Sequence, residues 1–155
     1  MNNFTHIDEN GNAIMVDVSS KDKTQRIALA SGDIYMSEEC FKAVIDKKNK
    51  KGDVLSVSQV AGIMVAKKNS ELIPLCHNIN LTSVKVYFET LENGFRAFCE
   101  AKCLGETGVE MEALTGVSIA LLTIYDMCKA IDKRMIIKDI HLVHKSGGKS
   151  GEFNY

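Results

Sequence analysis

The sequence predicts an α+β fold, a ferredoxin-like sandwich in which helices cover one face of an antiparallel sheet. The first observation behind this prediction is the order of elements along the chain: strand, two helices, two strands, long helix, strand. The second is an Asn-Gly pair between two alternating runs, a strong hairpin signal. The third is a length of 155 residues, 45% hydrophobic and 25% charged, which suits one globular domain.

The first half of the chain predicts a strand followed by two helices. Residues 27–36 form an apolar run and are expected to be the first strand. Ser37, followed by two acids, begins a helix that we expect to run to the basic residues 47–51 and to stop at Gly52. Asp53 caps a second helix that ends near Lys68, with apolar residues at spacings of three and four.

The second half predicts a hairpin, a long helix and a last strand. Residues 81–90 and 95–104 are strand-like, with alternate residues of the second run, from Phe95 to Cys103, on one face. Thr107 and Glu110 have the spacing of a capping box before a helix over 109–131. Residues 135–144 complete the sheet.

We expect residues 1–155 to be a single domain, with 1–25 and 145–155 as loop-like extensions that contribute to the site. The uncovered sheet face predicts an oligomer. Nineteen basic against 20 acidic side chains argue against nucleic acid as a partner, and neither a membrane span nor a secretory signal is evident. Five cysteines without a C-x-x-C pair indicate reduced thiols and a cytoplasmic location.

Lysines and glycines in the tail, residues 145–151, are suited to bind a phosphate. Gly148-Lys149-Ser150 is not a P-loop, because Val143 occupies the position of the first glycine and no helix follows. A flexible C-terminus is an equal alternative on composition alone.

Other candidate residues each have an ordinary alternative. Lys51 ends a lysine run whose mutual repulsion lowers lysine pKa, although such runs are usually solvated helix ends. His77 follows Cys76 directly, a spacing that does not support a metal site, so we predict none. On local evidence, a structural histidine with a hydrogen-bond partner is favoured over a catalytic one. Asp126 and Lys129 share a helix face and can form a charged pair. Glu112 and Asp126 are about 21 Å apart along the helix axis, so they belong either to two sites or to a site between subunits.

Eight strings of residues resemble, in order and over nearly the whole chain, the cyclic pyranopterin monophosphate synthase family of molybdenum cofactor biosynthesis. They are Thr5-His6-Ile7-Asp8, Met15-Val16-Asp17-Val18-Ser19, Lys51-Gly52-Asp53-Val54, Ala61-Gly62-Ile63, Ile73-Pro74-Leu75-Cys76-His77, Thr107-Gly108-Val109-Glu110-Met111-Glu112-Ala113-Leu114-Thr115, Leu122-Thr123-Ile124-Tyr125-Asp126-Met127-Cys128-Lys129-Ala130 and Lys145-Ser146-Gly147-Gly148-Lys149-Ser150-Gly151.

The resemblance implies a lyase that rearranges 3',8-cyclo-7,8-dihydro-GTP to cyclic pyranopterin monophosphate and releases pyrophosphate. It implies a homohexamer, a trimer of dimers, with active sites between subunits. It leaves open whether Mg²⁺ accompanies the pyrophosphate, and no other cofactor is expected.

By motif position, the resemblance makes Asp126, Lys51 and Lys129 catalytic. It assigns substrate binding to the segments Leu75-Cys76-His77 and Glu110-Met111-Glu112, and triphosphate binding to Arg26, Lys67, Lys145 and Lys149. Asn78 and Glu106 depart from the family pattern, and an acid at 106 is expected to weaken a phosphate contact. Two alternatives remain, a nucleotide-binding regulatory module that does not change its ligand and a structural assembly protein.

Overall fold

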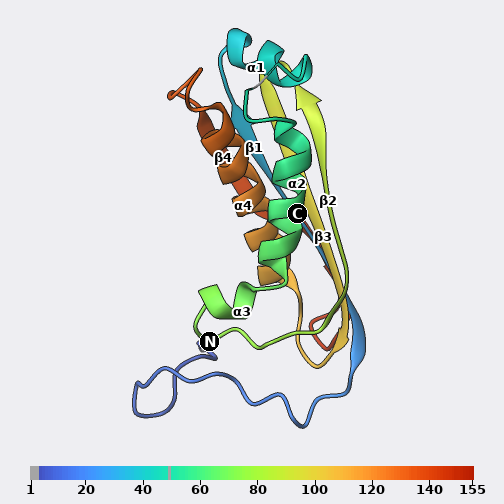
Figure 1. Cartoon of the computed structure of the whole chain (residues 1–155). Coiled ribbons are helices and arrows are strands. Elements are labelled where there is room, and N and C mark those ends of the chain that lie inside the picture. The colour runs from blue at the N-terminus through green and yellow to red at the C-terminus, as the bar shows by residue number, and fades with distance from the viewer. Residues whose placement is uncertain (1–3, 49) are drawn as a thin grey trace.

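A computed structural model describes residues 4–48 and 50–155. The elements are β1 (Thr24–Tyr35), α1 (Glu38–Ile45), α2 (Val54–Ala66), α3 (Asn69–Leu72), β2 (Leu81–Leu91), β3 (Gly94–Gly105), α4 (Glu110–Cys128), β4 (Ile136–Ser146) and β5 (Phe153–Asn154). The strands form one antiparallel sheet in the order β2-β3-β1-β4-β5. Helices α2 and α4 lie side by side over one face of it (Figure 1). The predicted ferredoxin-like α+β fold is confirmed.

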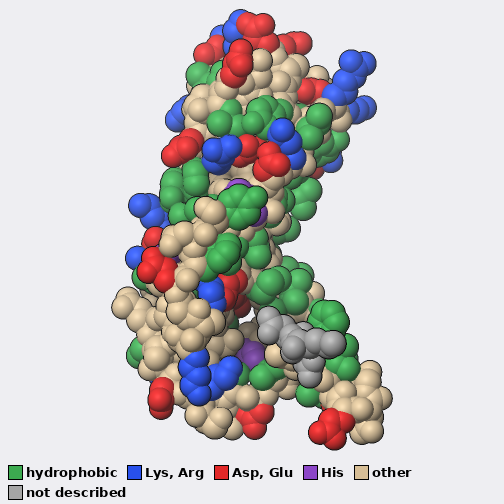
Figure 2. All heavy atoms as spheres, turned by 180° about the vertical axis from the view of Figure 1, so that it is seen from behind, with side chains coloured by type: hydrophobic (Ala, Val, Ile, Leu, Met, Phe, Trp, Pro, Cys, Tyr) green, Lys and Arg blue, Asp and Glu red, His purple; other side chains and the backbone are tan. Residues whose placement is uncertain are grey.

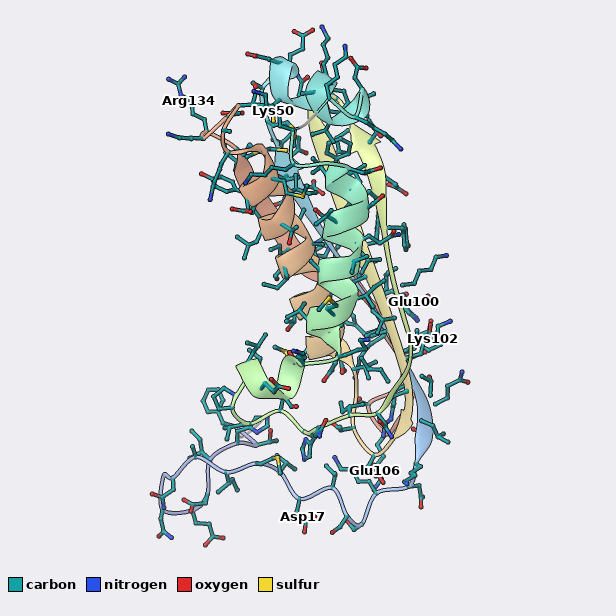
Figure 3. All side chains as sticks on the ribbon, viewed as in Figure 1. Asp17, Lys50, Glu100, Lys102, Glu106 and Arg134 are labelled. Carbon is teal, nitrogen blue, oxygen red and sulfur yellow. The ribbon has the colours of Figure 1, made fainter. Side chains whose placement is uncertain are left out.

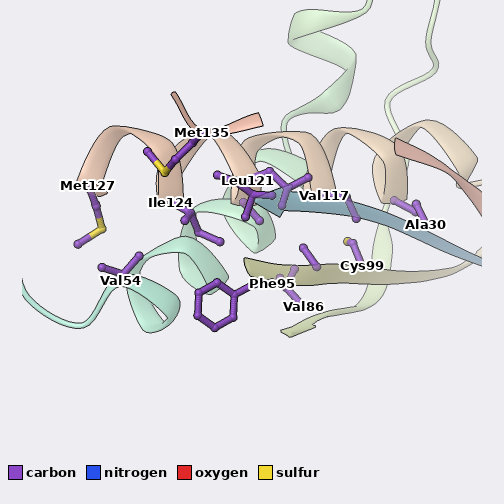
Figure 4. Packing of buried hydrophobic residues seen from close by; sticks show 14 of the residues in the cluster. Ala30, Val54, Val86, Phe95, Cys99, Val117, Leu121, Ile124, Met127 and Met135 are labelled. Atoms are coloured by element: carbon purple, nitrogen blue, oxygen red, sulfur yellow. The ribbon is translucent and has the colours of Figure 1, made fainter. Parts of the chain in front are cut away.

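The core fills the space between the sheet and the two long helices. Alternate residues of β3, from Phe95 to Cys103, face the helices and are buried, as their period of two predicts. Val117, Leu121 and Ile124 of α4 pack against them (Figure 4). Burying these side chains supplies the main stabilisation of the fold, because removal of apolar surface from water is the dominant favourable contribution to folding.

Glycines allow α2 and α4 to approach closely. A Cβ atom at Gly62 would lie 2.9 Å from the backbone oxygen of Gly116, and one at Gly116 would lie 2.5 Å from the Cys99 sulfur. Both distances are shorter than van der Waals contact. Gly62 therefore lets α2 approach the backbone of α4, and Gly116 lets α4 approach β3, where Cys99 lies.

Two predicted helix starts are confirmed and one is wrong. The Ser37 hydroxyl accepts a hydrogen bond from the Cys40 amide, and the Asp53 carboxylate accepts one from the Ser56 amide. The predicted capping box before α4 is absent, because Val109 is the N-cap residue and no side chain caps it. The Glu110 carboxylate instead lies 3.2 Å from the ammonium group of Lys145 at the end of β4.

Some element boundaries also differ from prediction. Helix α1 ends at Ile45 rather than within the lysine run, and residue 49 of that run lies outside the described residues. The hairpin between β2 and β3 is confirmed, but Leu91 pairs with Gly94, so the turn is centred on Glu92 and Asn93. Gly94 belongs to β3, where a Cβ would lie 2.1 Å from the oxygen of Ile34 in β1.

Helix α4 is long and apolar enough to cross a membrane by length and composition alone. Half of that stretch is buried against the sheet and α2, as expected for the core helix of a domain. The opposite face of the sheet carries no helix among the described residues, and charged and apolar side chains alternate over the surface seen from behind (Figure 2).

Candidate active site

The predicted site residues gather at opposite ends of α4. Lys50 and Arg134 mark one end of the molecule, and Glu106 and Asp17 mark the other (Figure 3). The catalytic candidates lie at the first end, around the C-terminus of α4, and most of the substrate-binding candidates lie at the second. Glu112 and Asp126 are about 21 Å apart along the helix, because each residue advances the axis by about 1.5 Å.

Lys51, Asp126 and Lys129 form one cluster, as predicted. The Lys129 ammonium group donates to the Asp126 carboxylate at 2.7 Å, one helical turn away. Lys51, in the loop between α1 and α2, donates to the Asp126 backbone oxygen at 3.0 Å and lies 3.7 Å from its carboxylate. The cluster is open to solvent, so two amines and a carboxylate are available to a ligand.

The electrostatics of this cluster differ from the expected lowering of lysine pKa. The hydrogen bond from Lys129 holds the pKa of Asp126 below its usual value, and the two lysine charges act in the same direction. The same hydrogen bond raises the pKa of Lys129. Lys129 is therefore held as an ammonium group that can donate a proton. Lys47 and Lys48 form ion pairs with Asp53 and Asp46 and take no part in the cluster.

At the other end of α4, one cavity of about 260 Å³ brings together six of the predicted substrate-binding residues. The lining includes Leu75, Cys76, His77, Glu110, Met111 and Glu112. The N-terminal segment closes one side, and the oxygen of Val16 lies 2.6 Å from Nε2 of His77. That hydrogen bond fixes the imidazole ring in the cavity wall.

Glu112 is the buried carboxylate of this cavity. Its residue is 3% exposed, and Oε1 accepts a hydrogen bond of 3.2 Å from the Asn69 amide. Burial raises the pKa of Glu112, while its own backbone N–H and the Asn69 amide oppose that shift. Burial likewise raises the pKa of the neighbouring Cys76 thiol.

A second cavity, of about 530 Å³, adjoins the first and contains the predicted phosphate-binding residues Arg26, Lys145 and Lys149. The Arg26 guanidinium donates to the backbone oxygens of Gly105 and Glu106. It lies so close over Gly148 that a Cβ there would clash with it. Arg26 is 9% exposed and makes no ion pair with a described carboxylate, so no carboxylate competes with an anion for its guanidinium group.

Lys145 lies between the two cavities. Its ammonium group donates to the Ser150 hydroxyl at 2.6 Å and pairs with Glu110 at 3.2 Å. Glu110 lines both cavities, as does Lys21, which no local sequence pattern indicated. An entering phosphate would compete with Glu110 for Lys145.

Lys67 does not join the other phosphate candidates. It is the exposed C-cap residue of α2 and lines neither of these cavities. Of the two departures from the family pattern, Asn78 is exposed and Glu106 lines the larger cavity, 3.9 Å from Lys23. In the described parts of the chain, no three His, Cys, Asp or Glu side chains are grouped so that they could hold a metal ion.

Comparison with known proteins decides the family. The family model described as the MoaC family matches residues 15–148. The chain belongs to the MoaC family. A cyclic pyranopterin monophosphate synthase of Clostridium perfringens (strain SM101 / Type A) is 56% identical over 156 residues, which cover 99% of each protein.

Two further MoaC relatives have the same name. The Clostridium botulinum (strain Alaska E43 / Type E3) protein is 57% identical, over 98% of this chain and 97% of the relative. The Magnetococcus marinus protein is 55% identical, over 99% of this chain and 95% of the relative. The matches extend over both ends of α4, so both groups of candidate residues lie within the region shared with the family.

Proposed function

We propose that this chain is a cyclic pyranopterin monophosphate synthase, a lyase of molybdenum cofactor biosynthesis. Its substrate is 3',8-cyclo-7,8-dihydro-GTP, and its products are cyclic pyranopterin monophosphate and pyrophosphate. The observation that carries the proposal is the Lys51–Asp126–Lys129 cluster, found in a chain that is 55–57% identical to named synthases over nearly its whole length.

The two lysines of the cluster supply the proton transfers. The purine-derived ring opens by hydrolysis and closes again as a pterin, which requires both an acid and a base. Lys129 enters as the acid, since Asp126 keeps it protonated. Lys51 reaches the same carboxylate from a different segment of the chain, so one carboxylate orients both amines.

The large cavity binds the triphosphate. A sugar hydroxyl attacks the α-phosphorus, and the bond from that phosphorus to the pyrophosphate leaving group breaks. Arg26, Lys145 and Lys149 stabilise the negative charge that develops on the leaving group. Any Mg²⁺ that accompanies the pyrophosphate would be held mainly by its phosphate oxygens.

The site is completed by a second copy of the chain. One substrate cannot reach groups separated by about 21 Å along one helix, so the cluster of one subunit meets the cavities of another. Apolar side chains on the outer face of α2, among them Val60 at 55% and Met64 at 51% exposure, are suited to a subunit interface. We propose a homohexamer, a trimer of dimers, working in the cytoplasm, where its free cysteines stay reduced.

The test is turnover of the cyclised substrate with detection of pyrophosphate. We expect Lys51→Ala and Lys129→Ala each to lower the rate at least about 100-fold while leaving the assembly intact. Lys42→Ala is the matched control, because Lys42 forms a similar exposed ion pair with Glu38 on α1.

Each rival gives a different result. A regulatory module would bind the substrate and release no pyrophosphate. A structural assembly protein would lose its oligomeric state, not its turnover, in Lys51→Ala. Full activity in Lys51→Ala or Lys129→Ala would refute the catalytic role given to that lysine.

A further inference from the structure

We infer that Asn69, held in place by Thr115, is a positioning residue that keeps Glu112 oriented and ionised so that its carboxylate accepts an N–H group of the substrate. The inference rests on the proposed function for the identity of the ligand. Its structural part, the control of Glu112 by Asn69, depends only on contacts within this chain.

Asn69 connects two turns of α4 through a buried amide. It is 2% exposed and begins the short helix α3. Its Nδ2 donates to Glu112 at 3.2 Å, and its Oδ1 accepts from the Thr115 hydroxyl at 2.6 Å. Both neighbours are on α4, three residues apart, so a single side chain from α3 holds both.

The orientation of this amide is tied to the charge of Glu112. With Nδ2 toward Glu112, the amide offers a donor to an ionised carboxylate. With the amide turned over, Oδ1 would face another acceptor, which is favourable only if Glu112 carries a proton. In the first orientation the Thr115 hydroxyl donates to Oδ1 and so holds the amide in place. Asn69, held by Thr115, therefore favours the ionised form, against the effects of burial and of the nearby Glu110 charge, which raise the pKa of Glu112.

The second oxygen of Glu112 is left for a ligand. Oε2 is buried and has no hydrogen-bond partner among the described residues. An unpaired buried carboxylate oxygen is costly, and buried polar atoms without a partner are rare in folded proteins. Glu112 lines the cavity that also contains Cys76 and His77, so a bound molecule can supply the missing donor there.

The chemistry of the missing donor follows from the acceptor. A carboxylate pairs well with adjacent N–H groups, such as the ring N–H and amino group of a 2-aminopyrimidinone, which guanine and pterin rings share. A ligand that lacks these N–H groups would leave Oε2 unpaired. Glu112 is thus a specificity-determining contact, and Asn69 acts through it.

The first arm of the test needs no substrate. The Glu112 carboxyl carbon is titrated by NMR in the wild type, Asn69→Leu, Thr115→Val and Thr115→Ser. We expect the pKa of Glu112 to rise in Asn69→Leu, to rise less in Thr115→Val and to stay unchanged in Thr115→Ser, which keeps the hydroxyl. An unchanged titration in both Asn69→Leu and Thr115→Val overturns the inference. Thr115→Val keeps the test open if Asn69→Leu does not fold.

The second arm measures kcat/KM against pH. Activity should fall on the acid side as Glu112 gains its proton, and in Asn69→Leu this fall should begin at higher pH. At neutral pH, kcat/KM should drop at least about tenfold, mainly through KM, because the contact is made in the bound substrate. Glu112→Gln should remove this acid-side dependence. A merely structural Asn69 would lower activity equally at every pH, and that result overturns the inference.

The two arms separate this inference from the proposed function. If the wild type releases no pyrophosphate but the Glu112 titration moves as expected, the function is wrong and the positioning of Glu112 by Asn69 stands. If turnover is normal and the titration does not move, the function stands and the positioning role fails.

Discussion

Lys129 holds its proton more tightly than an isolated lysine, because the Asp126 carboxylate stabilises its charge. Asp126→Asn keeps the shape of the side chain and removes this charge. We expect the pKa of Lys129 to fall, so that the amine loses its proton at lower pH than in the wild type. NMR titration of the Lys129 side chain measures the shift directly.

The same variant has a kinetic consequence. If Lys129 donates a proton during turnover, the alkaline fall of kcat should move to lower pH in Asp126→Asn, with a loss of about 100-fold at its optimum. Glu38→Gln, which removes the carboxylate partner of Lys42, should leave the kcat profile unchanged. An unchanged alkaline fall in Asp126→Asn would contradict the role of Lys129 as the acid.

Asp33 and Arg96 form a two-pronged ion pair between β1 and β3, with distances of 2.7 and 2.8 Å. The Asp33 side chain is 2% exposed and the Arg96 side chain 41%. The asymmetry predicts that Arg96→Met lowers the free energy of unfolding by about 2–4 kcal/mol, since it leaves a buried carboxylate without its guanidinium partner. Asp33→Asn should cost about 1–2 kcal/mol, since it leaves a half-exposed cation. Urea denaturation at neutral pH measures both.

The pH dependence of this pair has a definite sign. The Arg96 hydrogen bonds hold the pKa of Asp33 below its usual value of 3.8. The stabilisation is therefore complete above pH 3.8 and is lost as the pH falls through the lower value of the folded protein. The cost of Arg96→Met should shrink in acid, where a protonated Asp33 needs no cation. A cost independent of pH would contradict this account.

At the scale of elements, the packing of α4 on β3 depends on the absence of a side chain at Gly116. Gly116→Ala would bring a methyl group to 2.5 Å from the Cys99 sulfur and 3.4 Å from the Gly62 oxygen. We expect a loss of about 1–3 kcal/mol in the free energy of unfolding, as is typical for overpacking. Ser118→Ala, a half-buried change on the same helix, should cost less than about 0.5 kcal/mol. Equal costs of the two substitutions would argue against a close approach of α4 to β3 at Gly116.

Elements whose pattern is local were predicted well from the sequence. The period of two in β3 and the caps at Ser37 and Asp53 involve residues close together in the chain, and all three are confirmed. The capping box failed because Glu110 pairs with Lys145, 35 residues further on, and this long-range ion pair outcompetes the local hydrogen bond. The short strand β5 was missed because two residues show no period; it forms by pairing with β4.

In the candidate site, too, local contacts were predicted from the sequence and long-range contacts were not. The Asp126–Lys129 pair follows from helix geometry and was predicted from its spacing. The bond from Lys51 to Asp126 spans 75 residues, and only the family resemblance suggested that Lys51 belongs with them. No sequence pattern indicated Asn69, whose role depends on the buried amide between α3 and α4.

At the scale of the whole molecule, the separation of the two half-sites predicts complementation between defective subunits. His77→Ala damages the cavity end and Lys129→Ala the cluster end of each chain. When both variants are coexpressed in equal amounts, about one quarter of the shared sites should receive an intact half from each partner, if subunits mix at random. The mixture should then release pyrophosphate at about that fraction of the wild-type rate, although each variant alone is nearly inactive.

The control for complementation uses two changes in the same half-site. His77 and Glu112 line one cavity of a single chain, so coexpressed His77→Ala and Glu112→Gln can form no site with both residues intact. That mixture should stay nearly inactive, while the pairing of His77→Ala with Lys129→Ala recovers turnover. Equal inactivity of both mixtures, in assemblies shown to contain both variants, would mean that each site is made by one chain. The 21 Å between its parts along α4 would then need to be closed by a rearrangement within the subunit.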